Sequence, residues 1–345
     1  MNNILTLDPL SGDSWDTMTA SHLRASFFHS SSWTRVLKAS YGHKPFYLGE
    51  MNANQPRALL PIMEVNSPWK GRRGVALPFS DECGLLRFCE ASWDPIIKHA
   101  LELGRERGWK YFELRGDIPG DPPPRRWASF VGHEIDLSPG IDGLFDGFES
   151  SVRRAIRKSE KAGVALRVLD TLDATHQFYA LHCKSRRKHG VPPQPFSFFA
   201  NFWEHVLQKG SGFIVQAEYE GRTIAAAVFV HHGQIGLYKF GASEEASLHL
   251  RANDLVMWEA MKWYATRNYK TFSMGRSEPE NEGLRRFKRG FGTKEKSINY
   301  FRYDFGRQTF MTGNKHQIGG VSKLFKLTPL PVLRMVGRTV YPHLD

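Results

Sequence analysis

The stretch "SGFIVQAEYEGRTIAAAVFVHH", residues 211–232, decides the fold of this chain. Two apolar runs flank the polar turn Glu220-Gly221-Arg222, and this pattern predicts a β-hairpin. An earlier stretch, "KPFYLGEMNANQPRALLPIMEV" at 44–65, has the same order of strand, polar turn and strand. The repetition of one pattern predicts that the two halves of the chain are built alike.

Each hairpin is followed by a helical pattern and then by a short strand. In the first half the helical pattern covers 94–108 and precedes "WKYFEL"; in the second half it covers 253–268 and precedes "YKTFSM". Strands that alternate with helices in this way predict an α/β (α+β) fold with mixed sheets flanked by helices. A stretch rich in Gly, Asp and Ser at 139–151 is the expected joint between the halves.

We therefore predict three parts in the chain. A first domain covers 1–145, a second domain of the same type covers 146–305 and carries the active site, and the segment 306–345 packs back on the body. Within this last part, residues 321–344 favour a helix docked on the body; the alternative is a basic amphipathic segment that rests on anionic lipid. The segment combines Leu, Val and Met with four cations, Lys323, Lys326, Arg334 and Arg338.

The bulk composition limits the classes of protein that need to be considered. The 345 residues are 41% hydrophobic and include 3 cysteines. The sequence has no apolar run of about 18 residues, which a transmembrane helix would need, and its N-terminus lacks the pattern of a secretory signal. The cysteines fit neither a disulfide framework nor a metal site, so we expect no metal and a cytoplasmic location.

The net charge of +12 is concentrated in three short segments. Residues 151–167 sum to +5, and residues 184–188 and 281–296 sum to +4 each, so the rest of the chain is close to neutral. Charge gathered in this way predicts an anionic partner, such as a nucleotide, a phosphorylated carrier, RNA or a membrane surface. His182 and His189, which flank the second segment, are expected to be solvated helix histidines.

Residues 273–292, "SMGRSEPENEGLRRFKRGFG", are the strongest candidate for a site. A strand that ends near Met274 would bring Arg276 to the carboxyl edge of the sheet, where open α/β sheets bind ligands. Gly290 and Gly292 would let the backbone approach an anion closely. Between them and the strand lie four cations on more than one face of a helical turn, so that some can point into a cleft: Arg285, Arg286, Lys288 and Arg289.

The strand-to-helix junction before the helix expected at 255–267 lacks the usual acetyl-CoA motif. Arg251 is present, but Ala252, Asn253 and Asp254 stand where glycines would expose amides to a pyrophosphate, and the charge of Asp254 opposes one. Asn253 and Asp254 are instead expected to cap a helix at 255–267. A nucleophile elbow, a P-loop, a zinc ligand set and a dinucleotide-binding glycine motif are all absent from the sequence.

Taken together, these segments resemble the FemAB-like branch of the GNAT superfamily of acyltransferases. The motifs that carry the resemblance are "SVRRAIRKSEKAGV", "KSRRKHGVPPQP", "GLYKFGAS" and "ENEGLRRFKRGFG". The resemblance covers most of 25–305 and is strongest from 150 to 303. It implies two tandem acetyltransferase-like domains. The chain lacks the long coiled-coil hairpin of some tRNA-using members and is most similar to the compact acyltransferase-like branch.

The resemblance also implies roles for individual residues. The family places a Phe-Lys pair at its reaction centre, and the matching pair is Phe287-Lys288, whose ammonium would stabilise an oxyanion or a phosphate. Glu278, Glu280 and Glu282 are candidates for a general base by proximity alone. The expected substrate-binding residues around the pair are Arg276, Arg285, Arg286, Arg289, Gly290, Gly292, Tyr238, Lys239, Arg186, Arg187 and Lys188.

These expectations lead to one favoured function and one alternative. The favoured function is N-acyl transfer from acyl-CoA or aminoacyl-tRNA to an amine on a cell-envelope or polysaccharide precursor. That acceptor could be linked to a membrane, with the enzyme peripheral at the inner face. The alternative is a non-catalytic GNAT-like module that binds RNA or anionic lipid. Nothing in the sequence indicates an oligomeric state.

Overall fold

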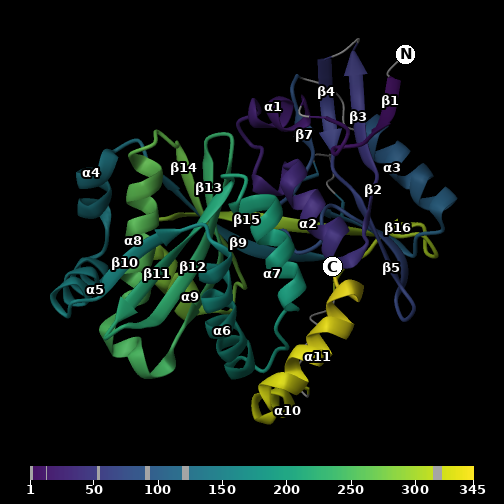
Figure 1. Ribbon diagram of the computed structural model, residues 1–345. Helices are drawn as coiled ribbons and strands as arrows, with labels where there is room; N and C mark the ends of the chain where they lie inside the picture. Colours follow the sequence, from purple (N-terminus) through teal and green to yellow (C-terminus); the bar gives the residue numbers. More distant parts are fainter. Residues whose placement is uncertain (1–2, 13, 53–54, 90–93, 119–123, 314–320) are drawn as a thin grey trace. The chain divides into compact units, whose positions relative to one another are not determined.

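The structure is a computed structural model that describes residues 3–12, 14–52, 55–89, 94–118, 124–313 and 321–345 (Figure 1). The chain divides into two compact units, of which the first contains residues 1–130, 297–316 and 340–345 and the second contains 131–296 and 317–339. The expected joint at 139–151 lies inside the second unit, because β9 (Ala128–Asp136) pairs there with β14 (Thr271–Ser277).

The sheet of the second unit has the strand order β10-β11-β12-β13-β14-β9. Its further strands are β10 (Ala165–Leu169), β11 (Gly212–Tyr219), β12 (Arg222–His232) and β13 (Ile235–Ser243). Neighbours pair antiparallel except β13 and β14, which are parallel. The hairpin predicted at 211–232 is confirmed: Tyr219 pairs with Arg222, and Glu220 and Gly221 between them have φ of 49° and 71°, which a tight hairpin turn requires.

The helices of the second unit lie between and after the strands of this sheet in the sequence. They are α4 (Gly140–Gly147), α5 (Ser150–Lys161), α6 (Leu172–Lys188), α7 (Phe196–Phe202), the π-helix η2 (Trp203–Leu207), the 3₁₀-helix η3 (Glu245–Leu250), α8 (Ala252–Ala265), α9 (Glu282–Arg289), α10 (Val321–Leu327) and α11 (Leu330–Val340). The final residue of α11, Val340, belongs to the first unit.

The predicted start of α8 was wrong. The helix begins at Ala252 because Arg251 adopts a left-handed conformation, with φ of 61°, and turns the chain directly from η3 into the helix. Neither expected cap acts as one. Asn253 donates a hydrogen bond from Nδ2 to Ser243 Oγ at 3.2 Å, and Asp254 lies within the first turn.

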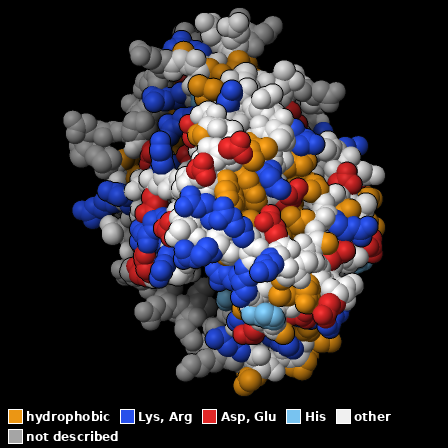
Figure 2. Space-filling model, turned by 90° about the vertical axis from the view of Figure 1, so that its left-hand side faces the viewer, with side chains coloured by type: hydrophobic (Ala, Val, Ile, Leu, Met, Phe, Trp, Pro, Cys, Tyr) orange, Lys and Arg blue, Asp and Glu red, His pale blue; other side chains and the backbone are white. Residues whose placement is uncertain are grey.

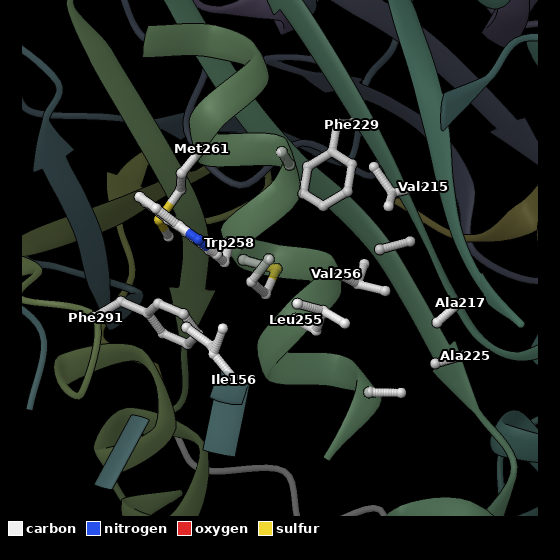
Figure 3. Packing of buried hydrophobic residues seen from close by; sticks show 14 of the residues in the cluster. Ile156, Val215, Ala217, Ala225, Phe229, Leu255, Val256, Trp258, Met261 and Phe291 are labelled. Atoms are coloured by element: carbon white, nitrogen blue, oxygen red, sulfur yellow. The ribbon is translucent and has the colours of Figure 1, made fainter. Parts of the chain in front are cut away.

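Helices α6 and α8 cover opposite faces of the sheet. Val215 and Ala217 of β11 point to the α8 face and join a core cluster with Trp258 (Figure 3). Gln216, between them, points the other way and donates a hydrogen bond from Nε2 to the carbonyl oxygen of Ala174 in α6. Because side chains alternate along a strand, these contacts place the two helices on different sides.

The first unit contains two sheets, with the strand orders β1-β3-β4-β7 and β15-β8-β6-β5-β2. The hairpin predicted within 44–65 is present as the antiparallel pair β3 and β4. Ile96 and Ala100 of α3 pack with Phe112 of β8 in the core. The elements are β1 (Asn3–Leu7), α1 (Ser14–Ala20), η1 (Phe27–His29), α2 (Ser31–Tyr41), β2 (Lys44–Pro45), β3 (Tyr47–Asn52), β4 (Gln55–Leu60), β5 (Met63–Ser67), β6 (Gly71–Val75), β7 (Leu86–Arg87), α3 (Asp94–Arg107), β8 (Tyr111–Arg115), β15 (Lys294–Asp304), β16 (Thr309–Phe310) beside β15, and η4 (Tyr341–His343).

Candidate active site

The second unit contains a cavity of about 480 Å³, which is within the usual size range of small-molecule sites. Its walls come from α6, from the adjacent strands β12 and β13, and from α8 and α9. Since α6 and α8 cover opposite faces of the sheet, the cavity is lined from both sides. The lining residues are His182, Ser185, Arg186, His189, Ala226, Ala227, Tyr238, Lys239, Phe240, Gly241, Ala242, Ser243, Asn253, Val256, Met257, Leu284 and Phe287.

A β-bulge at Lys239 shapes the floor of this cavity. Phe229 pairs with Tyr238 and Val228 pairs with Phe240, which leaves Lys239 as an extra residue in β13. Tyr238 and Phe240 therefore point to opposite faces of the sheet, although they are two residues apart. The parallel pairing of β13 with β14 ends at Leu237, directly before the bulge. The strands separate at the point where the cavity lies.

His182 forms a buried part of the α6 wall, so the expectation of a solvated histidine was wrong. The side chain is 5% exposed, and its Nε2 has no hydrogen-bond partner among the described residues. Its ring lies 5.1 Å from that of Phe199, centroid to centroid. Burial, with a smaller contribution from the charge of Arg186, lowers the pKa of His182 to about 3. The cavity wall thus presents a neutral imidazole.

The Phe-Lys pair on α9 is divided between the cavity and the interior. Phe287 lines the cavity, and its ring lies 5.4 Å from that of Phe291. Lys288 is 2% exposed and is not among the lining residues; its Nζ donates hydrogen bonds to the carbonyl oxygens of Gly275 at 3.2 Å and Arg276 at 2.9 Å. Successive helical residues are about 100° apart around the axis, so the two side chains leave the helix in different directions.

The match to a protein family falls on this part of the chain. Residues 147–289, from the end of α4 to the end of α9, match the model of the acetyltransferase (GNAT) domain. This chain carries a GNAT acetyltransferase domain. The match includes every residue that lines the cavity. The match confirms the prediction of a GNAT-type acyltransferase domain in the second half of the chain.

The similarity to solved structures covers more of this chain than the GNAT domain does. The crystal structure of FemX superposes with a TM-score of 0.68 at 12% identity, covering 86% of this chain and 96% of that one. A tandem GNAT protein from the clavulanic acid biosynthesis pathway gives 0.56 at 11%, covering 88% and 98%. The C-terminal domain of a putative lysylphosphatidylglycerol synthetase from Agrobacterium fabrum gives 0.53 at 13%, covering 78% and 86%. The predicted fold class is confirmed. None of the curated proteins matches the chain in sequence.

Arg285 and Arg289 of α9 form ion pairs at the surface of the GNAT domain. Arg285 binds Glu295 at 2.8 Å, and Arg289 pairs with Glu282. Arg286 is exposed. None of these arginines is among the cavity-lining residues. Of the proposed general bases, Glu282 is thus engaged in an ion pair, and the exposed Glu278 and Glu280 do not line the cavity either.

The two glycines after α9 lie close to other parts of the same domain. A Cβ on Gly290 would lie 2.7 Å from Cγ2 of Val152 in α5. Gly292 has a φ of 74°, and a Cβ there would lie 3.3 Å from the carbonyl oxygen of Gly147 in α4. Both therefore permit close packing of the α9 turn against α4 and α5. Their predicted part in substrate binding stays a prediction.

The remaining predicted residues are only partly brought together. Arg186, Tyr238 and Lys239 line the cavity. Lys188, at the end of α6, is exposed and pairs with Glu245 at 2.8 Å. Two half-buried residues, Arg187 on α6 and Arg276 on β14, do not line the cavity. Sequence reasoning missed His182, Ser185 and the apolar wall, because the bulge that gathers them has no signature in the sequence.

A second cavity of about 200 Å³ lies at the N-terminus of α8 and shares Phe287, Ser243 and Asn253 with the first. Its lining includes Arg251 and Asp254, whose side chains approach to 3.5 Å. Burial raises the pKa of the Asp254 carboxyl. This acidic group stands at the position where a GNAT domain with the usual motif would hold a pyrophosphate on helix amides.

Two further observations concern the described residues as a whole. They contain no group of three or more His, Cys, Asp or Glu side chains arranged to hold a metal ion. None of the helices formed by these residues is both long and apolar enough to cross a membrane.

Proposed function

We propose that the GNAT domain transfers an acyl or aminoacyl group from an activated carrier to an amine. The observation that carries this proposal is a cavity lined from both faces of the sheet at the Lys239 bulge. The donor and the acceptor can approach from opposite faces and meet where β13 and β14 separate. Holding two reactants together in this way converts a bimolecular reaction into an effectively unimolecular one.

The proposed chemistry uses three lining residues. The amine nitrogen attacks the donor carbonyl carbon and forms a C–N bond; the bond from that carbon to the carrier sulfur or oxygen then breaks, and the amine proton leaves with the carrier. The neutral imidazole of His182 accepts a hydrogen bond from the amine and orients its lone pair. Burial raises the pKa of Tyr238 to about 12, so its phenol stays protonated. The phenol then donates a hydrogen bond to the oxyanion. Phe287 packs against the acyl group.

Lys288 acts in this proposal as a positioning residue. Its ammonium joins the end of β14 to α9 through the carbonyl oxygens of Gly275 and Arg276. That contact holds Phe287, the preceding residue, against the cavity. The predicted catalytic pair thus consists of one side chain that meets the substrate and one that fixes its position.

Two charged features favour aminoacyl-tRNA over acyl-CoA as the donor. The carboxyl of Asp254 opposes a pyrophosphate at the start of α8. Helix α5 buries Val152 and Ile156 against the domain and exposes a row of cations: Arg154, Arg157, Lys158 and Lys161. Figure 2 looks onto the side where α4 and α5 lie in Figure 1, and Lys and Arg side chains gather there. Such a face suits the phosphates of RNA.

Equilibrium binding to CoA, acyl-CoAs, and charged and uncharged tRNA tests the donor. We expect a preference for charged tRNA and a loss of that affinity when the four exposed cations of α5 are replaced by Gln. Saturable binding of one acyl-CoA instead would assign the donor to CoA. Binding of none of these carriers, together with no transfer to any amine, would contradict the proposed enzyme.

For the acceptor we propose an amine on a cell-envelope or polysaccharide precursor, with the enzyme cytoplasmic and peripheral at the inner membrane face. The support is similarity of fold to FemX and to a putative lysylphosphatidylglycerol synthetase, and fold alone does not select a substrate. Mass spectrometry of products from soluble amines and membrane-linked precursors tests it. Transfer only to an unrelated soluble amine would overturn this choice of acceptor.

The basic face of α5 also supports the alternative, a module that binds RNA or anionic lipid without catalysis. That function predicts an affinity that falls gradually as cations are removed one by one, with a steep dependence on salt. It further predicts that His182→Phe has no effect on RNA affinity. Turnover that depends on His182 would exclude it.

A further inference from the structure

The C-terminal helices α10 and α11 are docked on the second unit through one face. Leu333 of α11 is fully buried, and the helix backbone at Gly337 lies directly against the carbonyl oxygen of Pro193. The guanidinium of Arg334 lies 5.4 Å from the ring centroid of Tyr179 in α6. Helix α10 also contacts α6. These contacts give the segment a defined orientation on the domain, which a loosely attached tail would not have.

The outer face of the same helices is apolar and exposed. Leu324 and Leu327 of α10 are 67% and 86% exposed, and Val332 and Met335 of α11 are 43% and 65% exposed. Within each helix the two side chains are three residues apart, so they lie on one side of it. We call these four residues the outer face. Apolar side chains gathered on the surface mark a site of contact with a partner or a membrane.

The charges in the segment are all positive. Residues 321–344 contain no Asp or Glu. Lys326 and Arg338 have exposed side chains. An apolar face bordered by cations, with no acidic residue in the segment, is complementary to the headgroups and acyl boundary of an anionic bilayer.

We propose that the outer face rests on an anionic lipid surface, with Leu324, Leu327 and Met335 at the headgroup boundary and Lys326 and Arg338 on lipid phosphates. The docked helix and the lipid-binding segment, which the sequence offered as alternatives, are then compatible, because docking and lipid contact would use different faces. The lipid contact deepens the proposed function and rests on it for its biological role. It would bring the enzyme to the surface at which a membrane-linked acceptor lies.

Co-sedimentation of the full chain with vesicles tests the proposal without donor, acceptor or turnover. We expect binding to phosphatidylcholine vesicles that contain phosphatidylglycerol, little binding to phosphatidylcholine alone, and weaker binding at high salt. The double variant Leu327→Asp/Met335→Asp should lower partitioning roughly hundredfold, about tenfold per side chain. The matched control is Leu23→Asp in the first unit, where Leu23 is 88% exposed, and it should bind as the wild type does.

Charge is tested separately with Arg338→Ala, which should lower partitioning about fivefold, as expected for one cation near an anionic surface. Its control, Arg105→Ala at another exposed cation on α3, should have no effect. Circular dichroism and the melting temperature verify that each variant is folded.

Three outcomes would overturn the proposal. The first is no anionic-lipid binding by the wild type, and the second is binding that the double variant retains. The third is self-association that the double variant abolishes in the absence of lipid, which would make the outer face an interface between two copies. Each outcome leaves the proposed acyl transfer untouched, because that activity is measured on its own with a soluble amine.

Discussion

Helix α9 and the C-terminal half of α6 are both rich in positive charge, yet the domain uses them differently. On α9, Arg285 pairs with Glu295, and Lys288 is buried on two backbone carbonyls. On α6, Arg186 and His182 line the cavity. Each helix carries four cations within five residues, yet the cluster on α9 stabilises its own surroundings, whereas α6 directs one of its cations into the space where chemistry can occur. Charge density along a sequence is therefore a weaker guide to a site than the direction in which each helix face points.

The largest expected effect is on stability, at Lys288. Lys288→Met removes the donor from two buried carbonyl oxygens, and we expect a loss of about 3 kcal/mol in the free energy of unfolding. Urea denaturation measures it. Arg286→Met, at an exposed position on the same helix, is the control and should change little. A Lys288→Met protein of normal stability that has lost turnover would instead restore Lys288 to the reaction centre and remove the contrast between the helices.

The next effect is on turnover, at His182. His182→Phe keeps the aromatic packing beside Phe199 but removes the hydrogen-bond acceptor, so kcat/KM should fall roughly hundredfold. His182→Gln, which keeps an acceptor, should recover part of the rate. Steady-state kinetics of both variants give the comparison. Equal rates for His182→Phe and the wild type would show that the α6 wall is structural.

Stability should also depend on pH through His182. The unfolded chain binds a proton at this residue near its ordinary pKa of 6.5, whereas the folded protein binds it only near pH 3. Acid therefore favours unfolding. Protonation of His182 in the unfolded chain should lower the free energy of unfolding by about 2 kcal/mol between about pH 7 and about pH 5. Denaturation of the wild type and of His182→Phe at several pH values isolates that part. Identical pH dependence in the two proteins would mean that His182 is accessible to protons in the folded state.

The smallest effects should separate the arginines of the two helices. Arg186→Gln removes a charge from the cavity wall, and we expect KM for an anionic substrate to rise about tenfold with kcat nearly unchanged. Arg285→Gln breaks a surface ion pair and should change KM by less than about twofold, as exposed pairs contribute little. The reverse ranking would place the substrate at α9, as the sequence alone suggested.

Local sequence patterns determined the main elements of the fold. The turn at Glu220-Gly221 and the apolar runs beside it specify the hairpin of β11 and β12, because register and turn geometry depend on neighbouring residues. The Phe-Lys motif likewise marks the segment that forms α9. The motif does not, however, state the direction in which each of its two side chains points.

Only the tertiary structure decided which of these residues meet. The extra residue Lys239 turns Tyr238 and Phe240 to opposite faces, and this happens because β12 pairs on both sides of it, a contact between segments that no local pattern encodes. Burial of His182 among aromatic rings from α7 and β13 is likewise a long-range outcome. Sequence by itself determined the GNAT domain and its basic helices. The packing of α6 and α8 across one sheet decided where the cavity lies, because a cavity is the space that distant segments leave between them.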